Sequence, residues 1–117
     1  MNPIVSILIH TPDWRTATKW YAAAFPTATR IYHQPDDFGH LDVNGVALEI
    51  VNADNKVGCG AAGSVVYWRV DDLQHRLQAL QAIGATLYRG PMQLEDADWM
   101  CQVRDPWGNC IGLRQAG

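Results

Sequence analysis

In the first half of the chain, hydrophobic residues occur first at the spacing of a strand, then at the spacing of a helix, and then at the spacing of a strand again. Asp13 is placed to cap a helix, and Pro26 is placed to end it. The dipeptide Asn44-Gly45, between two β-rich segments, is typical of a two-residue hairpin turn. We therefore expect one helix and four strands, the strands over residues 4–9, 29–33, 38–43 and 46–51.

The same order restarts after a segment rich in Gly, Ala and Asn. Asp71 or Asp72 is placed to cap a second helix, and Gly84 stands where a helix C-terminal glycine belongs. The remaining strands are expected over residues 65–70, 85–88, 99–103 and 110–114. Each half therefore has the order β-α-β-β-β.

The repeated order predicts an α+β fold made of two similar βαβββ modules. The modules cover about residues 1–52 and 64–117, and a linker at about 53–63 joins them. A length of 117 residues fits a single domain, so both modules are expected to belong to one domain.

The strand period of two separates each predicted sheet into an apolar face and a mixed face. The helices are expected to cover the apolar face. A two-residue turn at Asn44-Gly45 pairs Val43 with Val46 and brings His40 opposite Glu49. The mixed faces are expected to line one shared cavity, with these polar members: Ser6, His10, His40, Asp42, Glu49, Tyr67, Arg69 and Arg114.

Composition excludes several classes of partner. The net charge of −3 argues against nucleic acid, because phosphate binding requires a basic face. No segment is long enough to span a membrane, and no targeting signal is visible at the N-terminus. The three cysteines lack the spacing of a zinc site or a disulfide framework, which indicates a cytoplasmic protein.

Four segments together resemble the glyoxalase/bleomycin-resistance/dioxygenase superfamily, also called the vicinal oxygen chelate proteins. They are Thr11-Pro12-Asp13 leading to Trp20-Tyr21, the hairpin at 44–49, the segment 70–73 leading to 82–85, and Asp105-Pro106-Trp107-Gly108-Asn109 within 103–109. The resemblance implies a U-shaped mixed sheet around a cavity, with the helices on the outer face. It also implies a homodimer.

The resemblance also places the superfamily's four metal ligands, two in each module, at Ser6, Glu49, Val65 and Gly112. Only Glu49 is a competent ligand, since Val and Gly side chains cannot bind a metal and Ser binds the relevant divalent ions poorly. A catalytic metal generally keeps about three protein ligands. We therefore expect no metal and no other cofactor.

The favoured hypothesis is a small-molecule binding protein that is not an enzyme and that sequesters or senses a small aromatic or cationic compound. Its expected contacts are Ser6, His10, His40, Glu49, Tyr67, Arg69 and Trp99. Trp99 fits a lid over an aromatic ligand or a subunit interface, and Arg69 fits an anion contact or a salt bridge.

The alternative hypothesis is an enzyme of the same superfamily. Glu49 would then be the catalytic residue, as the base of an isomerase. A lyase or dioxygenase would need an unusual metal site made of His10, His40 and Glu49. An ion pair between His40 and Glu49 is the structural explanation of the same residues. A third hypothesis gives the chain no ligand and a role in protein association only.

Overall fold

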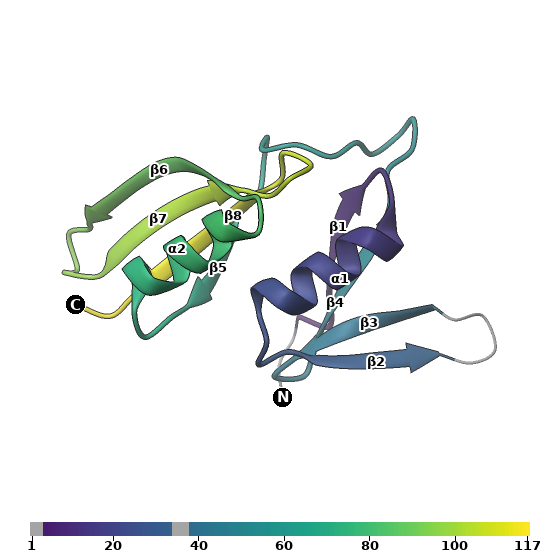
Figure 1. The fold of residues 1–117 in the computed structure, drawn as a ribbon, viewed down its shortest axis with the longest axis horizontal. Coiled ribbons are helices and arrows are strands. Elements are labelled where there is room, and N and C mark those ends of the chain that lie inside the picture. Colours follow the sequence, from purple (N-terminus) through teal and green to yellow (C-terminus); the bar gives the residue numbers. More distant parts are fainter. Residues whose placement is uncertain (1–3, 34–37) are drawn as a thin grey trace. The chain divides into compact units, whose positions relative to one another are not determined.

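The computed structural model describes residues 4–33 and 38–117 and shows a helix packed on one face of a four-stranded sheet, twice along the chain (Figure 1). The first half contains β1 (Ser6–Thr11), α1 (Trp14–Ala24), β2 (Thr29–His33), β3 (Phe38–Val43) and β4 (Val46–Asn52). The second half contains β5 (Val66–Arg69), α2 (Leu73–Ala82), β6 (Thr86–Gln93), β7 (Trp99–Arg104) and β8 (Cys110–Gln115).

The first sheet has the strand order β1-β4-β3-β2, with β1 parallel to β4 and the other pairs antiparallel. The predicted hairpin pairing of Val43 with Val46 is confirmed. Asn44 and Gly45 both have positive φ angles, of 52° and 89°, as a type I′ turn requires. Asp13 caps α1 by accepting hydrogen bonds from the Arg15 N–H and from a neighbouring hydroxyl.

The second sheet repeats this topology in the order β5-β8-β7-β6. Of the two candidate caps, Asp72 is the one that accepts the His75 N–H at the start of α2. The strand expected to end before Gly90-Pro91 instead continues to Gln93, with shifts of register on the way. This is possible because β6 lies at the edge of the sheet, where the missing N–H of Pro91 removes little pairing.

Each helix covers one face of its own sheet and closes a separate core. α1 packs on β1, β3 and β4, and α2 packs on β6, β7 and β8. The first core contains Ala17, Tyr21, Ala24, Phe25, Leu41, Leu48 and Ile50. The second core contains Leu73, Leu77, Leu80, Ala85, Cys101, Val103, Ile111 and Leu113. Burial of this apolar surface is the main force that holds each helix to its sheet.

The chain divides into two compact units, residues 1–59 and 60–117, which we call the first and the second module. The division falls inside the segment predicted as a linker. No helix among the described residues is long and apolar enough to cross a membrane.

Candidate functional site

The face of the first sheet that α1 leaves open carries Ser6, His10 and Glu49. In the parallel pairing of β1 with β4, Ser6 lies beside Ala47, and Glu49 lies beside Leu8. Residues two apart on a strand share a face, so Ser6, Leu8 and His10 line up along β1 with Glu49 adjacent on β4. The structure therefore brings these predicted residues to one face of the first module.

His40 is also on this face, but an ion pair with Glu49 does not form. The observed pairing of β3 with β4 runs from Val43 to Leu41 and stops one residue before His40. Among the described residues, the Glu49 side chain makes neither an ion pair nor a hydrogen bond. The carboxylate of Glu49 thus remains available on the open face.

His10 lies near Asp54, which follows β4. Hydrogen bonds from the backbone N–H groups of Val57 and Lys56 lower the pKa of the Asp54 carboxyl, and the proximity of His10 acts in the same direction. This proximity places a carboxylate near His10 at the end of the first sheet. It does not prevent the imidazole from contacting a ligand on the same face.

Tyr67 dominates the open face of the second sheet. It pairs with Gly112 on β8, and Gly112 pairs with Gln102 on β7. The Gln102 side-chain amide donates a hydrogen bond of 2.8 Å to the Tyr67 hydroxyl, so the tyrosine side chain crosses β8 from one neighbour to the other. With 40% of its surface exposed, Tyr67 presents an aromatic surface to solvent.

The tyrosine ring lies with its face on Gly112. A Cβ atom at position 112 would lie 2.4 Å, 2.6 Å and 2.6 Å from Cδ1, Cε1 and Cγ of Tyr67. Near-equal distances to three successive ring atoms require a position above the ring and not beyond its edge. The opposite face of the ring therefore points away from the sheet, which is the geometry of a stacking platform.

Arg69 lies two residues beyond Tyr67 on the same face and is held by a carboxylate. Its guanidinium lies 3.4 Å from Asp98 Oδ2, while 61% of its side-chain surface is exposed. Arg114 is the closer partner of Asp98, at 2.9 Å, and also pairs with Asp96. The hydrogen bond from Arg114 lowers the pKa of the Asp98 carboxyl, and the charge of Arg69 adds to this effect. The salt-bridge role of Arg69 is thus observed.

Two arginines that were not predicted from the sequence also lie on this face. Arg89 pairs with Gln102 across β6 and β7, and Arg104 pairs with Cys110 across β7 and β8. Both guanidinium charges lie close enough to Cys110 to oppose the burial that raises the pKa of its thiol. Arg89 was not predicted because the strand was expected over residues 85–88 only, whereas β6 continues to Gln93.

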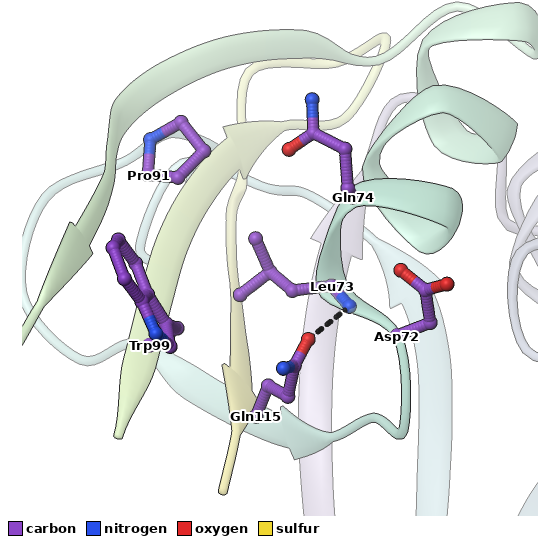
Figure 2. Close-up of a pocket in the computed structure, with 6 residues that line it drawn as sticks. All are labelled: Asp72, Leu73, Gln74, Pro91, Trp99 and Gln115. Carbon is purple, nitrogen blue, oxygen red and sulfur yellow. Dashed lines mark hydrogen bonds between the residues drawn. The ribbon is translucent and has the colours of Figure 1, made fainter. Parts of the chain in front are cut away.

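Trp99 lies on the other face of the second sheet. Its pairing with Gln115 gives it the same side as the buried Cys101, which faces α2. There Trp99 lines a hollow of about 340 Å³ at the start of α2. Pro91 and Trp99 lie on one side of this hollow, Asp72 lies on the other side, and Leu73 lies between (Figure 2). The sheet therefore separates Trp99 from Tyr67 and Arg69.

Comparison with known proteins identifies the fold. The amino-acid sequence matches no protein-family model and no curated protein. A solved glyoxalase/bleomycin resistance protein/dioxygenase family enzyme from Burkholderia phytofirmans PsJN matches with a TM-score of 0.79 and 17% identity, over 96% of this chain and 97% of that chain. This chain has the glyoxalase/bleomycin-resistance fold.

Two further solved structures support the same assignment. TioX from Micromonospora sp. ML1 has a TM-score of 0.72 and 17% identity, over 99% of this chain and 100% of that chain. A glyoxalase-related enzyme from Fulvimarina pelagi has a TM-score of 0.76 and 16% identity, over 98% of this chain and 88% of that chain. The fold implied by the resemblance of four short segments is confirmed, and so is the α+β class, with two helices and two four-stranded mixed sheets.

The metal of the superfamily does not fit the residues at the implied ligand positions of this glyoxalase/bleomycin-resistance fold. Val65 offers no donor atom, and the face of the Tyr67 ring occupies the space above Gly112. Ser6 and Glu49 are left as a pair on the first module. Within residues 4–33 and 38–117, no group of three or more His, Cys, Asp or Glu could hold a metal ion, and this includes His10, His40 and Glu49.

Proposed function

We propose that the protein binds a small planar aromatic compound, to sequester or sense it, without a resident catalytic metal. The observation that carries this proposal is the Tyr67 ring, which is held over Gly112 by the hydrogen bond from Gln102 and exposed on its outer face. A fixed aromatic ring stacks on a flat ligand at a low cost in conformational entropy.

The charges around Tyr67 favour an aromatic ligand that is neutral or acidic over a cationic one. Arg89 and Arg104 lie on the same face as Tyr67, and Arg69 is largely exposed. The carboxylates of Asp96 and Asp98, which could attract a cation, are both paired with Arg114. Arg69 is paired with Asp98, and Arg104 donates to the Gly108 carbonyl, but each guanidinium has further N–H groups that can donate to a carboxylate or a phenolic oxygen of the ligand.

Calorimetric titration with a planar aromatic acid such as 2-naphthoate tests this proposal. Replacing Tyr67 by serine should weaken binding roughly fivefold to tenfold, because the stacking surface is lost. The control is Val57→Ser, which removes an exposed apolar side chain from the first module. Equal affinities for the parent protein and Tyr67→Ser would show that stacking on Tyr67 does not contribute, and the proposal would be wrong.

One observation supports the enzymatic alternative, namely the carboxylate of Glu49 beside Leu8 on the open face of the first sheet, which forms no ion pair with residues 4–33 or 38–117. A carboxylate in this position could serve as a general base for an isomerase without a metal. If such turnover is found, Glu49→Gln should reduce kcat by about 10²–10⁴-fold, the usual contribution of general acid–base catalysis. Glu95→Gln, on an exposed turn, is the control. If Glu49→Gln retains its turnover, Glu49 is not the general base.

A further inference from the structure

We infer that the first module holds an additional binding site, for a small aromatic anion, in the hollow between α1 and the edge strand β2. The hollow has a volume of about 280 Å³, and its lining residues are Trp14, Arg15, Lys19, Arg30 and Tyr32. Arg30 pairs with the buried Leu41, so it lies on the side of the first sheet that faces α1. This inference does not depend on the function proposed above, because Tyr67 belongs to the second module.

The lining is strongly basic in a protein that is acidic as a whole. Three of the nine lysines and arginines line this one hollow, while the chain carries a net charge of −3. Arg15 and Lys19 are four residues apart on α1, a spacing that places like charges side by side and slightly destabilises a helix. No acidic residue is among the described residues that line the hollow. A bound anion would relieve this repulsion.

Two of the cations have no carboxylate partner in the part of the chain that the structure describes. Lys19 and Arg30 form no ion pair with any residue in 4–33 or 38–117. Lys19 is exposed and Arg30 is half-buried. A guanidinium and an ammonium that face one hollow can each donate charged hydrogen bonds to the oxygens of a phosphate or a carboxylate.

The two aromatic residues give the site a preference for a ring. The Arg15 guanidinium lies 4.6 Å from the centroid of the Trp14 ring, and the Arg30 guanidinium lies 4.8 Å from the centroid of the Tyr32 ring. These cation–π contacts hold the two arginines against the rings that line the same hollow. An occupant that combines an aromatic ring with an acidic group would contact both kinds of side chain.

The second module shows that the fold produces the hollow and that particular residues produce its charge. Leu73 and Gln74 follow the helix cap Asp72 as Trp14 and Arg15 follow the cap of α1, and they line the corresponding hollow (Figure 2). That hollow has a volume of about 340 Å³ and contains Asp72 but no Lys or Arg. The basic and doubly aromatic lining is therefore a property of the first module alone.

The size of the hollow limits the occupant. Pockets for drug-sized ligands measure about 300–1,000 Å³, and this hollow lies just below that range. The occupant is therefore a compound with a single ring and one acidic group. Phenyl phosphate has both features and is readily obtained, so it is the probe for the experiment.

Titration of the protein with phenyl phosphate, followed by calorimetry and by NMR of the indole N–H groups, tests the inference. We expect saturable binding, a shift of the Trp14 indole signal, and a loss of affinity as ionic strength rises. Lys19→Gln and Arg30→Gln should each weaken binding about tenfold, the effect of losing one charged hydrogen bond. Lys56→Gln, which makes the same charge change on an exposed loop of the same module, should leave the affinity unchanged.

Three results would overturn the inference. The first is no binding of phenyl phosphate at millimolar concentration. The second is binding that Lys19→Gln and Arg30→Gln do not weaken, or that Tyr67→Ser weakens instead, which would locate the compound on the second module. The third is equal affinity for inorganic phosphate, which would show that the aromatic ring is not recognised.

Discussion

Replacing Asp105 by alanine should lower the free energy of unfolding by about 2–4 kcal/mol, because it leaves backbone donors without acceptors. Asp105 is only 4% exposed. Its Oδ1 accepts the backbone N–H groups of Trp107 at 2.9 Å and of Asn109 at 2.8 Å, and its Oδ2 accepts the Asn109 side-chain amide at 3.1 Å. One carboxylate thus organises the turn between β7 and β8.

The consequence extends beyond the turn. The Asn109 side chain, oriented by Asp105, accepts a hydrogen bond of 2.9 Å from the Gly60 N–H at the start of the second module. Urea unfolding monitored by circular dichroism measures the loss of stability. Asp71→Ala, at an exposed aspartate before α2, should change stability by less than about 0.5 kcal/mol. A similar small effect of Asp105→Ala would mean that water satisfies these donors.

Asp105→Asn separates the two oxygens. The asparagine oxygen can still accept the backbone N–H groups of Trp107 and Asn109, but its NH₂ group would face the amide of Asn109. The expected loss is therefore smaller than for alanine, at about 1–2 kcal/mol. This result would show that the hydrogen bonds of the Asp105 carboxylate hold the turn Asp105-Pro106-Trp107-Gly108-Asn109.

The fold was predictable because its local signals are independent of packing. A capping aspartate, a hairpin dipeptide and an Asp-Pro turn each act over a few residues, so Asp13, Asn44-Gly45 and Asp105 could be read from the sequence. The alternation of side chains then placed Ser6, His10 and Glu49 on one face and Tyr67 and Arg69 on another. The shared cavity, the homodimer and the cytoplasmic location stay predictions.

The site was predictable only in part. The alternation of side chains along a strand predicts which face a residue lies on, but it does not predict how far a side chain reaches or where a strand is irregular. Trp99 was predicted to contact the ligand. It lies two residues from Cys101 on β7, so the two side chains share the face that packs against α2. Gln102 was missed because its role depends on reaching the Tyr67 hydroxyl across a strand. Arg89 was missed because the strand was expected to end before Gly90-Pro91 and instead continues to Gln93. The basic hollow was missed because the sequence does not show which side chains of α1 meet those of β2 when the helix packs on the sheet.

Replacing Gly112 by alanine should destabilise the second module by about 1–3 kcal/mol, the usual cost of overpacking. The new Cβ would lie 2.4 Å from Cδ1 of Tyr67, and real structures do not hold such a contact. The ring must therefore leave its position and lose the hydrogen bond from Gln102. Urea unfolding gives the change in stability, and calorimetry with 2-naphthoate should show a parallel loss of affinity if the ring is the stacking platform.

The same substitution in a Tyr67→Ser background distinguishes overpacking from a general intolerance of position 112. With the ring removed, Gly112→Ala should be neutral or stabilising by about 0–1 kcal/mol. The reason is that alanine has less conformational freedom than glycine in the unfolded chain and therefore loses less on folding. A loss that persists in the double variant would contradict the packing explanation. If the loss disappears, the Tyr67 ring alone excludes a side chain from position 112. One physical cause would then explain both the lack of a metal ligand at position 112 and the aromatic platform above it. A side chain long enough to bind a metal at position 112 and the Tyr67 ring cannot occupy the same space.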